Sequence, residues 1–308
     1  MGKLAFVFPG QGAQAVGMGR DAWEASEEAR KLFERADAVL GYSLSDLIFL
    51  GPEEELKQTY HTQPALVTVS SAYLAALTAK GVRPDFVAGH SLGEYSALVA
   101  AGVLNFEDAV KTVRRRGELM EAAVPSGQGA MAAVLGAERE PLAALCRELS
   151  EAGSGVELAN VNCPGQIVIS GTREGVQAVQ ERGKEIGAKR VLPLEVSGPF
   201  HSSLMMPAAE QLAGVLAELA LQEPSVPVVA NVTAEPVSEP EKLRSLLVEQ
   251  VYSPVLWEDS IRKLISLGVD TFVEIGSGAV LSGLIKKIDK TVTVITVNSW
   301  AAVESYPV

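Results

Sequence analysis

The sequence predicts an α/β protein with a parallel-sheet core and a smaller inserted subdomain. Short apolar runs typical of strands alternate with long amphipathic helical patterns, and such alternation builds parallel sheets. Between residues 127 and 198 the order changes to strand, helix, strand, strand, helix, strand, which is the ferredoxin-like plan. Turn-forming residues at 124–129 and 196–199 mark its limits. We therefore expect a core of residues 1–126 and 199–308 and an insert of residues 127–198.

Each expected strand is a short apolar run, and each expected helix repeats apolar residues at spacings of three and four. In the core, strands are expected at 4–8, 86–88, 226–230, 271–275 and 292–297. In the insert, strands are expected at 130–135, 156–160, 166–170 and 190–196, with helices at 139–150 and 173–186. The cleft between core and insert is the expected site, since ligands commonly bind where two domains meet.

The composition is that of an ordinary globular protein with an acidic balance. The 308 residues include 26 Lys and Arg against 38 Asp and Glu, a formal net charge of −12, so no broad attraction to nucleic acid or membrane is expected. The sequence lacks the apolar run of a signal peptide or membrane span, so we expect a cytoplasmic protein. Cys146 and Cys163 lack metal-ligand spacing and only three histidines accompany them, so no disulfide framework, metal or cofactor is expected.

The pattern GHSLG at residues 89–93 separates an expected strand from an expected helix at 94–101. Glycine accepts backbone angles that crowd a residue with a Cβ, so the pattern suits a turn tight enough to push Ser91 outward. Such a turn is a nucleophile elbow, and the Leu92 N–H at the helix start would lie beside an oxyanion. The alternative is a chance match, because the chain contains 28 glycines.

A second glycine pattern follows the first expected strand. Gly10, Gly12 and Ala15 match the dinucleotide-binding fingerprint. That fingerprint needs an acidic residue about twenty positions later at the end of a strand, whereas Glu34 lies in a stretch with helical spacing. Nucleotide binding is therefore disfavoured, and the alternative is a loop whose backbone N–H groups supply a second oxyanion donor.

A serine nucleophile needs a base, and the chain offers three histidines for that role. His90 directly precedes the serine, so side-chain alternation points it away, and His61 is expected in a polar turn. His201 lies where the insert rejoins the core and is the remaining candidate; alternatively, it is a solvated loop residue. No acidic residue between positions 91 and 201 is placed to orient the imidazole, so we expect a backbone carbonyl to do so.

Three consecutive arginines lie on the helix expected at 106–124. The apolar residues of this helix define a buried stripe, from which Arg115 points away while Arg114 and Arg116 flank it. A flanking arginine can reach a cleft and bind a carboxylate through two parallel hydrogen bonds. The alternative is a solvated, charged helix face.

Taken together, these features resemble the malonyl-CoA:acyl carrier protein transacylase family over essentially the whole chain. The stretches that carry the resemblance are FVFPGQGAQ, TQPAL, GHSLGEYSALVAAGVL, RRRGELM, GAMAAVLG, VNCPGQIVISG, VSGPFHSSLM and QVYSPVLW. The resemblance implies a hydrolase-like α/β core with a ferredoxin-like insert, in agreement with the fold expected above.

The resemblance implies a two-step transfer of a malonyl group that supplies fatty acid synthesis. Ser91 would attack the thioester of malonyl-CoA, and His201 would take the proton and return it to the leaving thiol. The phosphopantetheine thiol of acyl carrier protein would then attack the malonyl-serine ester. Arg116 would hold the malonyl carboxylate and disfavour an acyl group without one.

The resemblance also implies four supporting residues. The backbone N–H groups of Gln11 and Leu92 would form the oxyanion hole, and the backbone carbonyl of Gln250 would orient the histidine. Phe200 would crowd an α-methyl branch on the acyl group, or it is an ordinary core aromatic residue.

Two other classes of function share part of this pattern. A serine thioesterase or esterase would have the same elbow and base but would admit water to the acyl-enzyme. The missing acid and the cleft arginine argue against it. A non-catalytic carrier-protein-binding module is disfavoured because a nucleophile, a base and an anion-binding residue are all present.

The charge of the chain bears on its expected partner. Acyl carrier proteins are typically acidic, and a chain at −12 would repel such a partner overall. We therefore expect docking at a local basic patch, for which Lys189-Arg190 and Lys286-Lys287 are the candidates, with solvated lysines as the alternative.

Overall fold

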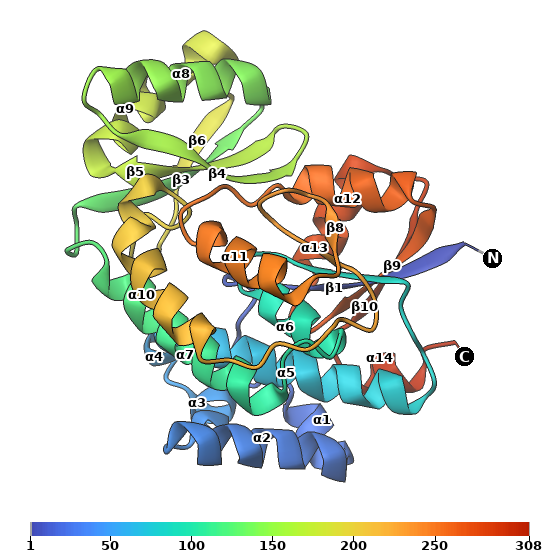
Figure 1. The fold of residues 1–308 in the computed structure, drawn as a ribbon. Helices are drawn as coiled ribbons and strands as arrows, with labels where there is room; N and C mark the ends of the chain where they lie inside the picture. The colour runs from blue at the N-terminus through green and yellow to red at the C-terminus, as the bar shows by residue number, and fades with distance from the viewer. Residues whose placement is uncertain (1, 308) are drawn as a thin grey trace.

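The structure is a computed structural model; it describes residues 2–307, which contain two separate sheets (Figure 1). The larger sheet has six strands in the order β10-β9-β1-β2-β7-β8, and its pairs are parallel except for β7 with β8. Its strands are β1 Lys3–Phe8, β2 Phe86–Gly89, β7 Val228–Val229, β8 Pro236–Val237, β9 Val269–Ile275 and β10 Thr293–Val297. The central strands β1 and β2 end at the same edge, where ligands of parallel sheets bind.

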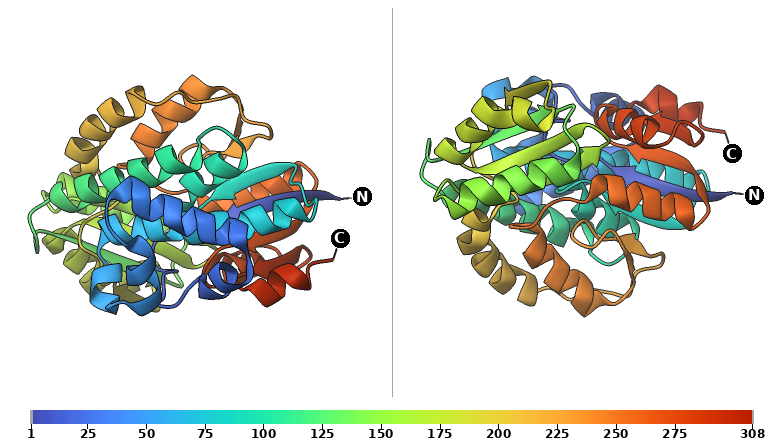
Figure 2. Two further views of the ribbon diagram at one scale, coloured as in Figure 1. Left: turned by 90° about the horizontal axis from the view of Figure 1, so that it is seen from below. Right: turned by 90° about the horizontal axis from the view of Figure 1, so that it is seen from above.

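The smaller sheet is antiparallel, in the order β4-β5-β3-β6. Its elements are β3 Gly129–Leu135, α8 Arg139–Glu151, β4 Val156–Cys163, β5 Gln166–Thr172, α9 Arg173–Arg182 and β6 Arg190–Pro193. This insert lies at the opposite end of the molecule from the two termini (Figure 2). The predicted fold class is thereby confirmed, whereas the domain limits 1–126, 127–198 and 199–308 remain a prediction.

Helices cover both faces of the larger sheet, as strands that are buried on both sides require. The core helices are α1 Arg20–Ala25, α2 Glu27–Leu40, α3 Leu44–Leu50, α4 Glu53–Leu56, α5 Thr59–Ala79, α6 Gly93–Ala100, α7 Phe106–Ala122, η2 Ser203–Met205, α10 Met206–Ala217, α11 Pro240–Gln250, α12 Trp257–Ser266, α13 Val280–Ile288 and α14 Trp300–Glu304. Ala5 and Val7 of β1 pack in the cluster that contains α12 and α13, whereas Phe6 and Phe8 belong to the cluster that contains α2 and α5. Within residues 2–307, no helix combines the length and apolar character that a membrane crossing needs.

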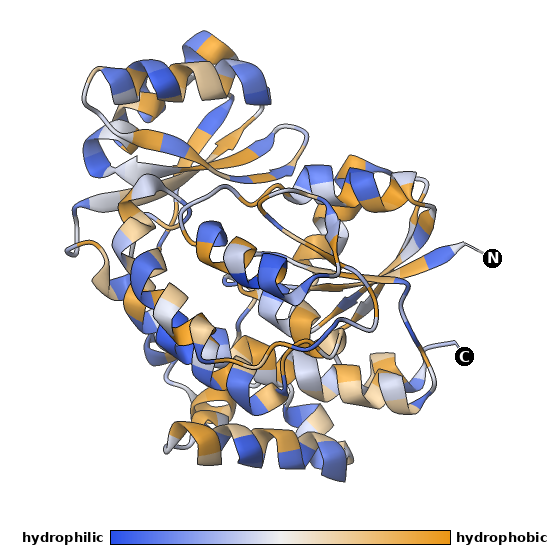
Figure 3. Cartoon of the chain, viewed as in Figure 1, coloured by the Kyte–Doolittle hydropathy of each residue, from blue (hydrophilic) through white to orange (hydrophobic). Residues whose placement is uncertain are grey.

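The insert packs α8 and α9 against one face of its sheet and turns the other face to the core. Ala132 and Val134 of β3 belong to the cluster that contains Leu142 and Leu145 of α8. Met131, from the opposite face of the same strand, belongs to the large core cluster. Figure 3 shows hydrophobic and hydrophilic residues on different sides of α8, in keeping with a helix that is buried on one side. The second face of the insert sheet therefore forms one wall of the cleft.

Some expected elements are shorter in the structure. The strand expected at 226–230 is reduced to the two residues of β7, and it begins directly after Pro227, which has no N–H for a ladder. The helix expected at 173–186 ends at Arg182 and continues as a 3₁₀ turn, η1 Gly183–Ile186. The strand expected at 190–196 ends at Pro193.

The expectation for His61 is wrong: it lies inside α5 and not in a polar turn. The helix runs through Pro64, which has no N–H to give to the Tyr60 carbonyl four residues earlier. That carbonyl accepts a hydrogen bond from Arg114 Nη1 instead, at 3.3 Å. A contact between two helices therefore replaces the hydrogen bond that proline removes.

Candidate active site

Ser91 lies after the carboxyl end of β2, in the turn that leads into α6. Its backbone φ is +51°, a left-handed conformation that strains a residue with a Cβ. A Cβ on Gly89 would lie 1.9 Å from the Gly93 carbonyl carbon, and a Cβ on Gly93 would lie 2.1 Å from the Phe8 oxygen. Glycine is therefore required on both sides of the serine, because β1, β2 and α6 approach too closely for a side chain.

His201 and Ser91 are in direct contact. The Ser91 Oγ lies 2.8 Å from His201 Nε2, and His201 Nδ1 lies 2.8 Å from the Gln250 carbonyl oxygen. Because a carbonyl only accepts, Nδ1 carries the ring proton and Nε2 is left to accept from the serine hydroxyl. The backbone N–H of His201 donates to the Val251 carbonyl at 3.2 Å, which helps hold the residue at its φ of +58°. The pair has the geometry of a nucleophile and its base.

His201 is neutral at physiological pH. Its side chain is buried, and this burial, together with the positive charge of Arg116, lowers the pKa of His201 to about 3. An imidazole that is neutral at pH 7 can accept a proton from a serine hydroxyl.

Arg116 is the buried member of the three arginines, with 1% of its surface exposed. It donates to Gln63 Oε1 at 2.9 Å, to Gln250 Oε1 at 3.0 Å and to Ser91 Oγ at 3.2 Å. All three partners are uncharged, and within residues 2–307 its Nε has no hydrogen-bond partner. A buried guanidinium with an unused donor and no acid in contact is suited to an anionic ligand.

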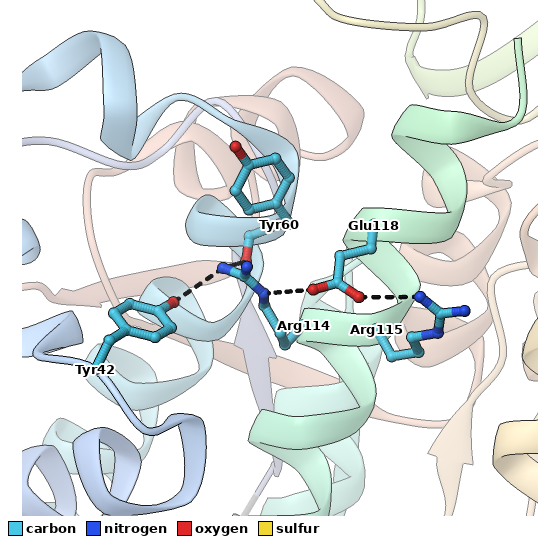
Figure 4. Close-up of polar contacts among 5 residues, drawn as sticks. All are labelled: Tyr42, Tyr60, Arg114, Arg115 and Glu118. Carbon is cyan, nitrogen blue, oxygen red and sulfur yellow. Dashed lines mark hydrogen bonds and ion pairs between the residues drawn. The ribbon is translucent and has the colours of Figure 1, made fainter.

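The other two arginines both contact Glu118 (Figure 4). Arg114 lies 2.8 Å from Glu118 Oε1 and 3.1 Å from the Tyr42 hydroxyl, and Arg115 lies 3.1 Å from Glu118 Oε2. The Arg115 side chain is 49% exposed, as its position on the helix predicted. Because successive residues turn by 100° around a helix, Arg116 enters the site while its neighbours pair with one acid outside it.

A cavity of about 110 Å³ opens above the Ser91 hydroxyl. It is lined by Gln11, His90, Ser91, Leu92, Arg116, Met120, Met131, Asn160, Leu194, Val196, Phe200 and His201. A second cavity of about 300 Å³ shares Gln11, His90, Asn160 and Leu194 with it and extends to the half-exposed Val280 on α13. The two cavities therefore adjoin each other, and the smaller one contains the serine.

Three further predicted residues line the smaller cavity. The backbone N–H groups of Gln11 and Leu92 find no acceptor in the described part of the chain. Two such groups beside a nucleophile can receive an oxyanion. Phe200 is 5% exposed and lies in the same wall as His201, so it occupies both of its expected positions, the core and the cavity.

The remaining histidines do not contact the serine. His90 Nε2 lies 2.8 Å from Asn162 Oδ1, and its ring packs on Trp257 with the ring centroids 5.6 Å apart. His61 Nδ1 lies 3.1 Å from the Glu55 carbonyl. Across residues 2–307, no group of three or more His, Cys, Asp and Glu side chains is arranged to hold a metal ion.

Sequence reasoning missed three buried polar residues of the site. Gln63 contacts Arg116, and Asn231 Oδ1 accepts from the Ser91 N–H at 2.8 Å. Glu94 lies behind them, and its burial raises its pKa to about 7. Gln63 and Glu94 both fall within stretches that carry the family resemblance, TQPAL and GHSLGEYSALVAAGVL, which was a usable signal. Asn231 had no signal, because it lies 140 positions from the serine that it contacts.

The chain is similar to known proteins over nearly its full length. The model of the acyl transferase domain family matches residues 5–301. A malonyl CoA-acyl carrier protein transacylase of Bacillus subtilis is 55% identical over 304 residues, which cover 99% of this chain and 96% of that protein. One from Staphylococcus aureus is 48% identical over 306 residues, with 99% of each chain covered.

Solved structures give the same picture. An acyl carrier protein S-malonyltransferase from Vibrio cholerae aligns with a TM-score of 0.96 at 46% identity, covering 98% of this chain and 99% of that one. A malonyl-transacylase solved in complex with its type II PKS acyl-carrier protein aligns with a TM-score of 0.95 at 44% identity, covering 98% of both chains.

Proposed function

This chain belongs to the malonyl-CoA:acyl carrier protein transacylase family, and from that premise we propose how its residues carry out the transfer. The enzyme is an acyltransferase that moves a malonyl group from malonyl-CoA to the phosphopantetheine thiol of acyl carrier protein, for fatty acid synthesis. The Ser91 hydroxyl lies between His201 and Arg116, and this observation supports the roles that we assign to the three residues. A base and an anion-binding group thus meet at a single nucleophile.

In the first half-reaction, the Ser91 Oγ attacks the thioester carbonyl of malonyl-CoA while His201 Nε2 takes the hydroxyl proton. The carbonyl oxygen becomes an oxyanion, which the N–H groups of Gln11 and Leu92 receive. The C–S bond then breaks and His201 returns its proton to the leaving sulfur. The Gln250 carbonyl stabilises the imidazolium that forms between these two proton transfers.

In the second half-reaction, the thiol of the carrier's phosphopantetheine arm attacks the malonyl-serine ester. His201 takes the thiol proton, a C–S bond forms, and the C–O bond to Ser91 breaks. The proton returns to the serine oxygen, so the enzyme leaves the cycle unchanged. A group of the chain thus holds each proton and each developing charge. We propose that the reaction uses no metal or other cofactor. We also propose that the enzyme acts in the cytoplasm.

Two residues select the acyl group in this proposal. Arg116 binds the malonyl carboxylate, because it is positively charged, buried and free of any acidic partner in contact. An acetyl group would leave that buried guanidinium without an anionic partner, at a cost of about 1–3 kcal/mol or more. Phe200, in the wall beside His201, would crowd an α-methyl branch.

The test of the proposal is incubation of the wild-type protein with labelled malonyl-CoA, followed by mass measurement of the intact protein. We expect one malonyl group per chain, and its loss when holo acyl carrier protein is added, with the label recovered on the carrier. A serine thioesterase would instead release CoA and free malonate at the same rate with or without the carrier. The absence of any acyl-enzyme would contradict the proposed intermediate.

Arg116→Ala is expected to lower kcat/KM for malonyl transfer by ~10²-fold, because up to two charge-assisted hydrogen bonds to the carboxylate are lost. Transfer of acetyl from acetyl-CoA should improve relative to malonyl transfer, since the penalty for an unpaired guanidinium disappears. Arg115→Ala is the matched control, because Arg115 is half exposed and pairs with Glu118 outside the cavity. Equal ratios of malonyl to acetyl transfer in the two variants would remove Arg116 from the selection step.

Charge reversal at Lys286 or Lys189 is expected to weaken docking of the acidic carrier protein. Lys286 and Lys189 are exposed, and α13, which carries Lys286, lines the larger cavity. In Lys286→Glu or Lys189→Glu we expect the KM for the carrier to rise roughly 5-fold at low salt, the effect of about 1 kcal/mol. The effect should shrink at high salt, and the first half-reaction should be unchanged. Lys31→Glu on α2 is the control; unchanged carrier kinetics in both test variants would place docking elsewhere.

A further inference from the structure

A buried carboxyl group lies behind the elbow, and the proposed reaction does not use it. Glu94 stands in the first turn of α6 and is 1% exposed. Its Oε2 accepts two hydrogen bonds, from the Asn231 backbone N–H at 3.0 Å and from Gln250 Nε2 at 2.9 Å. Both donors are uncharged. Burying a carboxyl group costs free energy unless the group is hydrogen-bonded. The two residues that donate to Glu94 therefore indicate its role.

The hydrogen bond between Glu94 and Gln250 concerns the orientation of the Gln250 side-chain amide. Its Nε2 faces three acceptors, namely Glu94 Oε2, the Ser91 carbonyl at 3.0 Å and Asn231 Oδ1 at 3.1 Å. Its Oε1 accepts from Arg116 Nη2 at 3.0 Å. A reversed amide would set its NH₂ group against the guanidinium, donor to donor, and its oxygen against the carboxyl oxygen, acceptor to acceptor. Glu94 supplies the shortest of the three contacts that turn the NH₂ group away from Arg116, and so it helps to keep an oxygen facing the guanidinium.

The hydrogen bond between Glu94 and the Asn231 backbone supports the position of the nucleophile. Asn231 gives its backbone N–H to Glu94, and its side chain bonds the elbow on both sides of the turn. Asn231 Oδ1 accepts from the Ser91 N–H at 2.8 Å, and its Nδ2 donates to the Gly89 carbonyl at 2.7 Å. Ser91 holds a strained φ of +51°, which persists only where the surrounding structure enforces it. The position of the Asn231 segment is thus coupled to the position of the Ser91 hydroxyl.

We propose that Glu94 is a positioning residue for malonyl selection: its carboxyl oxygen orients Gln250, so that Gln250 holds the Arg116 guanidinium, and anchors Asn231, so that Asn231 holds Ser91. What matters is an acceptor oxygen at the reach of a glutamate side chain, and not its negative charge. The inference rests on the proposed function, because it presumes that Arg116 selects the acyl group.

Two conservative substitutions test separately the length of the Glu94 side chain and its negative charge. Glu94→Gln keeps an acceptor oxygen at the same distance from the backbone and removes the charge. Glu94→Asp keeps the charge but shortens the side chain by one methylene, so that it cannot reach both donors. We expect E94Q to keep the wild-type ratio of malonyl to acetyl kcat/KM within about 3-fold, and E94D to lower that ratio at least about 10-fold, the effect of one hydrogen bond to a charged group. A partly inactive preparation lowers both rates equally and leaves the ratio unchanged.

The same measurement in an Arg116→Ala background completes the test. Without the guanidinium, E94D should no longer change the ratio, because nothing remains for Gln250 to orient. A wild-type ratio in E94D, a ratio in E94Q as low as in E94D, or an equal effect of E94D in both backgrounds would each overturn the role of Glu94. A wild-type enzyme that does not prefer malonyl, or an Arg116→Ala variant with an unchanged ratio, would instead overturn the proposed function of Arg116.

Discussion

Ser91→Ala is expected to abolish the malonyl adduct and to lower malonyl transfer on the order of 10⁵-fold, since loss of a serine nucleophile removes the covalent route altogether. The physical reason lies in the elbow, where Ser91 Oγ contacts both the His201 imidazole and the Arg116 guanidinium. The measurement is the mass of the intact protein after incubation with malonyl-CoA, together with the rate of carrier loading.

Ser96→Ala is the matched control for this result. Ser96 lies on α6, the helix that follows the turn; it is 2% exposed, and its hydroxyl has no hydrogen-bond partner within residues 2–307. Cys146 and Cys163 are the competing nucleophiles, but both are buried, and burial raises the pKa of Cys146 to about 12. A malonyl group found on either cysteine in the Ser91→Ala protein would contradict the assignment of the nucleophile.

His201→Ala is expected to lower both half-reactions on the order of 10³-fold, the usual loss when a general base is removed. His90→Ala should cost far less, because His90 pairs with Asn162 and does not contact the serine hydroxyl. Single-turnover acylation by malonyl-CoA measures the first half-reaction directly. Equal losses in the two variants would mean that the base is misassigned.

The pH dependence of acylation gives an independent check on His201. Burial and the Arg116 charge lower the pKa of His201 below its usual value near 6.5, so it stays neutral, and able to act as a base, below that pH. The rate of acylation should therefore stay constant as the pH falls through 6.5, the ordinary pKa of histidine, and should decline only at lower pH. In Arg116→Ala the decline should begin at higher pH, because loss of a nearby positive charge stabilises the protonated imidazole. An acid limb that does not move between the two proteins would contradict this electrostatic coupling.

Local sequence was enough to predict the fold class, and the structure confirms it. The alternation along β1, where Ala5 and Val7 face one cluster and Phe6 and Phe8 the other, depends only on the two-residue repeat of a strand. The two glycines around Ser91 are required by crowding at one turn, and this requirement is visible in a five-residue pattern. The family and its activity, inferred from such stretches, are confirmed by the relatives, whereas the roles of the individual site residues stay predictions until the variants are measured.

Tertiary structure decided the properties that depend on distances between remote segments. Gln63, Asn231 and Gln250 come from three separate regions of the chain, yet together they contact Arg116 and the Ser91 turn. The residues that neighbour Asn231 along the chain do not predict its contact with Ser91. The low pKa of His201 follows from burial, which no local pattern encodes. The reason is the range of the forces involved: backbone angles and periodicity are set by neighbours along the chain, whereas hydrogen bonds and desolvation are set by neighbours in space.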